Sequence, residues 1–225
     1  MLVSKFAICD VLKTGKFYLE GQEVVILKNG KRVCGSGGAV LNQALLQSKS
    51  YFEVKIQQSG HWSIGLCTLN TDLNKTRGGL DRCSWCLNAE NYVMNDGQVT
   101  YDLNEMYSEG NGTVNDDTEQ LLPVKSSNIV GSLLPATNRS VLPQEGDILG
   151  ITYDHVELNF YLNGKNLNIP TILKLNSQTP KGEYNNEIYP CLFVDDGAIL
   201  DLIVDNFNYS IPSGYDKIMV EQTLL

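Results

Sequence analysis

Short segments in which apolar and polar residues alternate recur along the chain, and Asn-Gly or Asp-Gly pairs separate them. In segment 156–162 every second residue, beginning with Val156, is apolar, which is the period of a half-buried strand. Asn163-Gly164 follows at once, and both residues tolerate the positive φ that a tight antiparallel hairpin needs. The same kind of pair stands at 29–30, 96–97 and 196–197. The chain is therefore predicted to fold as antiparallel β-structure.

Further segments extend this pattern, and no segment has the pattern of an amphipathic helix. Strands are predicted at 24–28, 31–34, 51–56, 61–67, 98–101, 148–153, 188–194 and 199–204, with a further apolar segment at 83–94 and a glycine-rich loop at 35–38. About ten strands joined by turns favour a β-sandwich, because each of two packed sheets needs one apolar inner face.

The length of 225 residues suits one large β domain with a core of its own. Residues 1–16 are expected to be loosely ordered, and residues 17–225 to form a single domain. Two polar stretches, at about 105–140 and 174–186, are predicted to be insertions. The first contains five acidic and two basic residues, and it has too few apolar side chains to offset the entropy lost on ordering, so we expect it to be mobile.

The net charge of -9 excludes a nucleic-acid-binding surface built on clustered Lys and Arg. No stretch approaches the roughly 18 consecutive apolar residues of a membrane span, so we expect no membrane anchor. Most of the six cysteines lie in or beside apolar segments, where a free thiol packs as a small hydrophobe. We therefore expect a cytoplasmic protein, with a nuclear setting equally compatible, and a monomer.

Four pieces of the chain, in this order, resemble the SPRY domain family. They are Tyr51-Phe52-Glu53-Val54, Trp62-Ser63-Ile64-Gly65-Leu66, Gly146-Asp147-Ile148 with Phe160-Tyr161-Leu162-Asn163-Gly164, and Ile188-Tyr189-Pro190 with Pro212-Ser213-Gly214-Tyr215. The resemblance implies an all-β, bent antiparallel two-sheet sandwich of concanavalin-like architecture with two loop insertions. It also implies a non-enzymatic protein-interaction module, an adaptor or scaffold without cofactor or metal, that binds a peptide segment or partner surface.

The resemblance places partner binding in three loops at one end of the sandwich, at 35–40, 77–80 and 195–197. The candidate partner-binding residues are Gly35, Ser36, Gly37, Gly38, Arg77, Gly78, Gly79, Leu80, Asp195, Asp196 and Gly197. Relatives that bind acidic, Asn-rich peptides carry an arginine in the first loop and a tryptophan in the last. This chain has Ser36 and Asp196 in those loops, so that specificity is not transferred.

Two interpretations of these loops are equally open on physical grounds. The glycines can expose backbone amides to a partner, Arg77 can donate a bidentate hydrogen bond, and Asp195 and Asp196 would favour a basic or amide-rich partner. Alternatively, the glycines satisfy turn geometry and the aspartates cap a solvated hairpin. Trp85 is similarly open, since it can pack in the core or anchor an interface.

Other constellations favour ordinary packing or solvation over chemistry. Cys83-Ser84-Trp85-Cys86 lacks further zinc ligands at recognisable spacing, and on a strand its two thiols would point to opposite faces. A lectin-like carbohydrate binder, with Ca²⁺ at Asp195, Asp196 and Asp201, is the alternative function, but Ca²⁺ needs 6 to 8 oxygens. A hydrolase using His155 is a third hypothesis; neither His155 nor His61 stands near a G-x-S-x-G motif.

Overall fold

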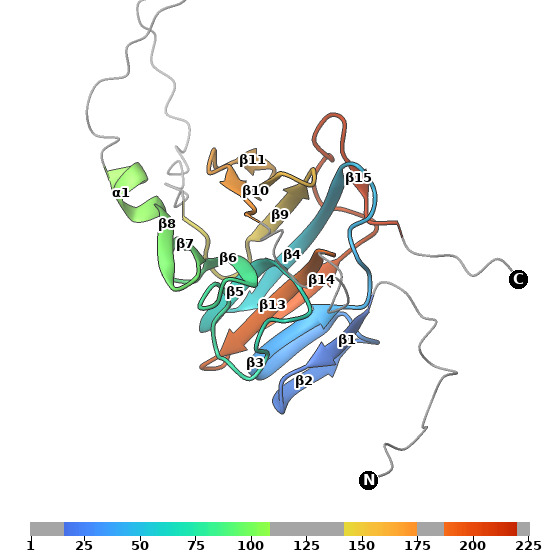
Figure 1. Cartoon of the computed structure of the whole chain (residues 1–225), viewed down its shortest axis with the longest axis vertical. Coiled ribbons are helices and arrows are strands. Elements are labelled where there is room, and N and C mark those ends of the chain that lie inside the picture. The colour runs from blue at the N-terminus through green and yellow to red at the C-terminus, as the bar shows by residue number, and fades with distance from the viewer. Residues whose placement is uncertain (1–15, 109–141, 175–186, 220–225) are drawn as a thin grey trace, which may run out of the picture.

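The computed structural model describes residues 16–108, 142–174 and 187–219 (Figure 1). One helix and fifteen strand segments lie in these ranges. They are β1 (Phe17–Glu20), β2 (Glu23–Leu27), β3 (Arg32–Leu41), β4 (Ser50–Gln58), β5 (His61–Cys67), β6 (Ser84–Asn88), β7 (Tyr92–Asn95), β8 (Gln98–Asp102), α1 (Leu103–Ser108), β9 (Ile148–Tyr153), β10 (Glu157–Leu162), β11 (Lys165–Asn166), β12 (Thr171–Ile172), β13 (Tyr189–Asp195), β14 (Ile199–Ile203) and β15 (Asp216–Lys217).

The strands form one curled, almost wholly antiparallel sheet, in the order β11-β10-β9-β4-β14-β3-β13-β5-β6-β7-β8. The ten-residue strand β3 joins two branches, because its first half pairs with β14 and its second half pairs with β13. The expected all-β antiparallel fold is confirmed. The two predicted sheets, however, are connected through β3 into a single hydrogen-bonded path, since this strand is long enough to serve both branches.

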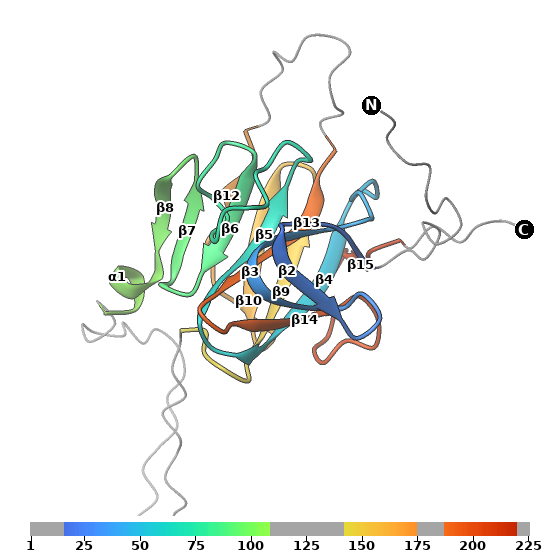
Figure 2. The same ribbon diagram turned by 90° about the horizontal axis from the view of Figure 1, so that it is seen from below.

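The main hydrophobic core lies between the two branches, which curl toward each other (Figure 2). Apolar residues from β4, β9 and β10 meet those of β5 and β6 there, as strand alternation predicts. Trp62 and Phe160 belong to this core as expected, and Trp85 joins them with only 2% of its surface exposed. The interface-anchor interpretation of Trp85 is therefore wrong.

The predicted turns agree with the backbone. Asn29-Gly30, Asp96-Gly97, Asn163-Gly164 and Asp196-Gly197 all have positive φ at both residues. Three of the pairs close hairpins between paired antiparallel strands, at β2–β3, β7–β8 and β10–β11. Asp196-Gly197 turns the chain from β13 into β14, and these two strands both pair with β3 and not with each other. Asn, Asp and Gly reach this conformation at little cost, which is why these dipeptides predict hairpins.

Two predictions of local structure are corrected, and others fall on residues that the structure does not describe. Strand β10 begins at Glu157, one residue later than predicted, and Val156 is 58% exposed. The cause is a turn: His155 has a φ of 71°, and Asp154 Oδ1 accepts hydrogen bonds from the backbone N–H groups of Val156 and Glu157. A short helix, α1, covers the first residues of the predicted insertion at 105–140, and Asp102 caps its N-terminus. Residues 109–141 and 175–186, which hold the rest of both predicted insertions, lie outside the described residues, as do residues 1–15 of the N-terminal segment.

Glu53 of β4 is fully buried on the face of the sheet that points away from the main core. Its Oε1 accepts hydrogen bonds from the Tyr51 hydroxyl (3.0 Å) and the Tyr209 backbone N–H (3.0 Å). Its Oε2 accepts two from Asn208, from the backbone N–H (2.9 Å) and from Nδ2 (3.1 Å). This carboxylate therefore fastens the C-terminal segment to the outer face of β4.

Asp201 of β14 forms a second charged cluster with Arg32 and Lys28. Arg32 donates to both carboxylate oxygens, at 2.5 and 2.7 Å, and Lys28 Nζ lies 2.8 Å from Oδ2. Partial burial by itself raises the pKa of Asp201, but the hydrogen bonds and positive charges of Arg32 and Lys28 outweigh burial and hold that pKa below its ordinary value of 3.8. The ionised form is therefore stabilised in the folded protein.

Replacing Asp201 with asparagine is expected to lower the free energy of unfolding by about 1–3 kcal/mol at pH 7, because charge-assisted hydrogen bonds are lost. A carboxyl group with a depressed folded-state pKa stabilises fully above its unfolded value and loses that contribution as pH falls through the folded-state pKa. The difference between wild type and Asp201→Asn should thus shrink below pH 3.8 in urea unfolding series. Asp205→Asn, which breaks the exposed pair with Lys31, should cost under about 1 kcal/mol. An equal, pH-independent loss in both variants would contradict this account.

Within the residues described, no helix combines the length and the apolar character needed to cross a membrane.

Candidate functional site

The first candidate segment, 35–38, is part of strand β3 and is not a loop. Gly37 and Gly38 are buried, and the Gly38 N–H donates to the Leu73 carbonyl at 2.7 Å. A Cβ atom on Gly35 would lie 2.3 Å from the Glu23 carbonyl oxygen, and one on Gly37 would lie 2.8 Å from that of Leu73. These glycines let the chain's own backbone approach β3 closely. Gly37 and Gly38 are thereby covered, whereas Gly35 is exposed and Ser36 half-buried.

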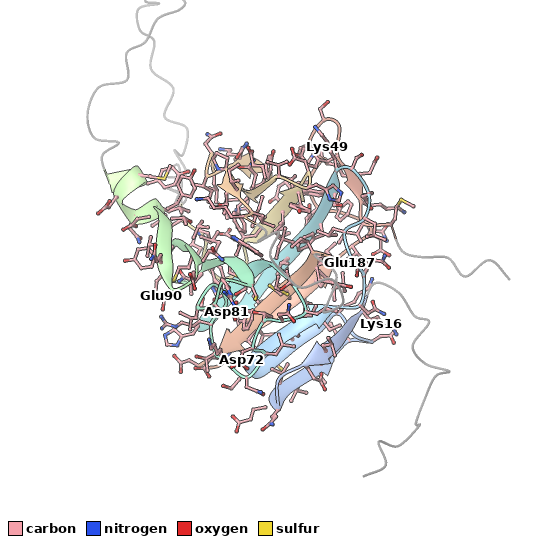
Figure 3. The ribbon with its side chains drawn as sticks, viewed as in Figure 1. Lys16, Lys49, Asp72, Asp81, Glu90 and Glu187 are labelled. Atoms are coloured by element: carbon pink, nitrogen blue, oxygen red, sulfur yellow. The ribbon has the colours of Figure 1, made fainter. Side chains whose placement is uncertain are left out.

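The second candidate segment, 77–80, belongs to the connection between β5 and β6, which crosses the outer face of β5, β6 and β13. Asp81 organises this connection: its carboxylate accepts from the hydroxyls of Thr71 (2.9 Å) and Ser84 (3.0 Å) and from the backbone N–H of Cys83 (2.9 Å). Figure 3 labels Asp72 and Asp81 on this connection, with Glu90 toward the same side of the molecule. These hydrogen bonds give the connection a defined conformation.

Phe193 brings the first two segments together. A Cβ on Gly38 would lie 2.4 Å from one edge of the Phe193 ring, and a Cβ on Gly78 would lie 2.7 Å from the other edge. The buried ring thus fits between two glycines that are 40 positions apart in the sequence. Segments 35–38 and 77–80 thus lie close together in the structure, but the space between them is filled by the buried Phe193 ring.

A small second core surrounds Phe193, and it contains Val40, Cys67, Cys86 and Cys191. Cys86 Sγ lies 3.8 Å from Cys191 Sγ, while both strands pair with Gly65 of β5 between them. Burial raises the pKa of the Cys191 thiol, and hydrogen bonds from Cys67 and Cys86 raise it further, so this thiol stays protonated. Cys86 of the C-x-x-C motif therefore packs as a small hydrophobe, as predicted.

The third candidate segment is the tip of the turn between β13 and β14, at the lower end of these strands in Figure 1. Asp196 and Gly197 are exposed, with φ values of 49° and 78°. The Ala198 N–H donates to the Asp195 carbonyl (3.0 Å), and Gln58 Nε2 donates to the Gly197 carbonyl (2.8 Å). The connection between β4 and β5 thus holds the tip, since Gly60 also packs against its backbone.

Negative charge gathers beside this tip. Glu145 accepts a hydrogen bond from the Ser59 N–H (2.9 Å), next to Gly60, and thereby joins Asp195 and Asp196 at the same end of the sheet. We call Glu145, Asp195 and Asp196 the acidic rim. Sequence reasoning missed Glu145, although its place in a turn immediately before strand β9 was a usable signal.

Arg77, predicted as a free bidentate donor, is engaged within the protein. Its Nη2 lies 2.7 Å from Glu90 Oε1. Leu80, by contrast, is 39% exposed on the same connection. Of the second segment, therefore, Leu80 is a surface residue, whereas Gly78 and Gly79 are buried.

The structure also places the residues of the rejected chemistry. Asp201 is bound by Arg32 and Lys28, which removes it from a calcium site with Asp195 and Asp196. His155 Nε2 lies 2.8 Å from the Gln47 carbonyl oxygen, and its ring packs beside that of Tyr153. Within the described ranges, no three His, Cys, Asp or Glu side chains are grouped so that they could hold a metal ion. The lectin and hydrolase hypotheses thus gain no supporting geometry.

Comparison with known sequences identifies one family. The family model described as the SPRY domain matches residues 49–206. SPRY domain-containing protein 7 of Gallus gallus is 40% identical over 205 residues, covering 91% of this chain and 82% of the relative. The Homo sapiens protein of that name is 38% identical over 204 residues, with the same coverage.

Two solved structures are similar at low sequence identity. The PSpry domain of TRIM65 is 13% identical with a TM-score of 0.46, and the match covers 83% of this chain and 87% of that one. Stonustoxin is 13% identical with a TM-score of 0.48, and the match covers 84% of this chain and 26% of the toxin.

Proposed function

This chain belongs to the SPRY domain family, and from that premise we propose that it is a non-enzymatic adaptor or scaffold that binds a protein partner through the acidic rim. SPRY domains generally act as protein-interaction modules. The observation that carries the proposal is the turn between β13 and β14, which has two adjacent carboxylates, the half-buried Asp195 and the exposed Asp196, and is held by Gln58 and Gly60. Carboxylates on a turn that is already held in place cost little further ordering when a partner binds.

The charge of the acidic rim determines the partner chemistry in this proposal. Asp195, Asp196 and Glu145 would attract Lys, Arg or amide groups of a peptide segment or partner surface, and the negative charge of the whole chain would steer a basic partner to them. Gly37, Gly38 and Gly78 support this surface from beneath and do not touch the partner.

The proposal includes a setting in the cytoplasm or nucleus and a monomeric state. Free thiols at Cys67, Cys86 and Cys191 are compatible with a reducing compartment. Cell fractionation of the tagged full chain, together with sedimentation equilibrium of the purified protein, tests both statements.

Reversing the charge of the turn between β13 and β14 is expected to weaken partner capture strongly. The double variant Asp195→Lys with Asp196→Lys changes the local charge from two negative to two positive, so a basic partner should bind at least about tenfold more weakly. Wild type and variant are compared by quantitative affinity capture from cytosolic extract, and each protein lost with the variant is then titrated in purified form.

The matched control is Asp205→Lys with Asp216→Lys, which makes the same change in total charge at the opposite ends of β14 and β4. Both residues are exposed, and Asp205 has only a surface ion pair with Lys31. This control should retain the captured proteins. Equal loss in both double variants would show a dependence on net charge alone, and equal retention in both would refute the acidic rim as the binding surface.

A further inference from the structure

Strand β8 ends one branch of the sheet, and within the described ranges its one ladder partner is β7. Gln98, Val99 and Thr100 are exposed, and Figures 1 and 2 show β8 with α1 at the margin of the molecule. An edge strand presents a row of unpaired backbone N–H and C=O groups. We propose that β8 binds an extended, cationic segment of a partner protein by strand addition, at a surface separate from the acidic rim.

The composition of β8 favours such pairing. Natural edge strands are commonly blunted by Lys or Pro, whereas Gln98–Asp102 contains neither and includes the strand-favouring residues Val99, Thr100 and Tyr101. Strand β2 is the other five-residue strand with a single ladder partner in the described ranges. Lys28 and Lys31 follow β2 directly, so the two edges differ in charge.

An apolar patch lies next to the β8 edge. A bulge at Thr100 places Val99 opposite Met94 and Tyr101 opposite Val93, so Val99 turns outward while Tyr101 packs against the core. Val99 is 50% exposed, and Leu80 lies nearby because the Gly97 N–H donates to the Gly79 carbonyl at 2.9 Å. Val99, Leu80 and Met94 can therefore receive an apolar side chain from the added strand.

The charge around β8 identifies the occupant. Residues 83–108, which form β6, β7, β8 and α1, contain four acidic residues and no Lys, Arg or His. Glu90 is paired with Arg77, and Asp96, Asp102 and Glu105 surround the edge strand. A second copy of the chain would bring a like-charged edge to this place, which is unfavourable. The occupant that fits is a segment alternating Lys or Arg with aliphatic residues.

The test uses the full-length protein and a blocked hexapeptide of alternating Lys and Val. Addition of the peptide should slow hydrogen–deuterium exchange at residues 98–102 and shift their amide NMR signals. Val99→Lys, which adds a charge to the edge, should weaken binding about tenfold. Val25→Lys on β2 is the matched control, since Val25 is 49% exposed, and it should leave binding unchanged.

Equal binding of a Glu-Val peptide would overturn the role of charge, and equal binding of the Lys-Val peptide N-methylated at alternate residues would overturn strand addition. Exchange protection elsewhere in the molecule would overturn the location. Complete protection of the β8 amides before peptide is added would show that the edge is not open. Self-association through β8 in sedimentation equilibrium, abolished by Val99→Lys, would also overturn it. The Asp195→Lys with Asp196→Lys variant should bind the peptide like wild type, so failure of the acidic rim and failure of β8 are distinguishable.

Discussion

Replacing Glu53 with alanine is expected to lower the free energy of unfolding by about 3–5 kcal/mol, which is a large share of the stability of an ordinary domain. The variant removes the acceptor of four hydrogen bonds: one from the buried Tyr51 hydroxyl, and three partly buried ones from the Tyr209 N–H and both Asn208 nitrogens. The Tyr51 hydroxyl is left buried without a partner and costs its desolvation, whereas the donors of the exposed Asn208 can turn to water and cost mainly the hydrogen bonds that are lost. Chemical denaturation monitored by tryptophan fluorescence measures the loss.

Glu53→Gln provides the matched comparison, because glutamine keeps the size of the side chain and one of its two acceptor oxygens. Its amide nitrogen must face either the Asn208 donors or those of Tyr51 and Tyr209, so we expect about half the loss of the alanine variant. Burial raises the pKa of Tyr51, and the charge and hydrogen bond of Glu53 raise it further, so the hydroxyl remains a donor in the folded wild type. An alanine variant as stable as wild type would show that the Glu53 cluster does not hold the C-terminal segment.

The Glu53 variants should also show a local change in hydrogen–deuterium exchange. Tyr51 packs edge-on against Phe207, with ring centroids 5.0 Å apart, and Glu53 binds the next two residues. Loss of the carboxylate should therefore speed hydrogen–deuterium exchange at 207–209 before it affects β5 or β6. Uniform acceleration across the molecule would instead indicate a purely global loss of stability.

Glu53 marks the limit of what strand alternation can predict. The alternation of 51–56 puts Phe52, Val54 and Ile56 on one face of the strand, and the structure places that face in the core. Glu53 lies on the other face, and alternation gives no sign that this face is buried as well. The structure covers this outer face with residues more than 150 positions away in sequence. Alternation tells which residues share a face, but whether that face is covered depends on long-range packing.

In the candidate site, too, local features could be predicted from the sequence, and features that depend on long-range packing could not. The Asp196-Gly197 turn was predictable because its chemistry is local, as were the free, packed state of Cys86 and the core positions of Trp62 and Phe160. The glycine run at 35–38 was misassigned to a loop, since glycines also occur wherever another backbone approaches a strand closely. The Arg77–Glu90 ion pair could not be predicted because it depends on the path of the β5–β6 connection.

Gly38→Ala is expected to destabilise the fold by about 2–3 kcal/mol, because its Cβ would overlap the Phe193 ring at 2.4 Å. The ring cannot move away, since Gly78 closes its opposite edge and the surrounding second core is buried. Gly78→Ala should be similarly costly, as its Cβ would meet both the ring and Cys86 Sγ at 2.5 Å. Urea unfolding of the two variants measures these losses.

A double-mutant cycle assigns the cause of this loss to the aromatic ring. Phe193→Leu alone should cost about 1–2 kcal/mol through lost volume, but it removes the outer ring atoms that an added methyl group would strike. Gly38→Ala should then cost under about 1 kcal/mol in the leucine background, a coupling of about 1–2 kcal/mol. Additive losses would mean that Gly38 is required by the β3 backbone and not by Phe193. The same variants bear on the proposed function. Strand β13 runs from Phe193 to Asp195 and leads into Asp196, so a looser Phe193 contact should hold these two aspartates less firmly. Such variants should therefore weaken partner capture even though Asp195 and Asp196 themselves are unchanged.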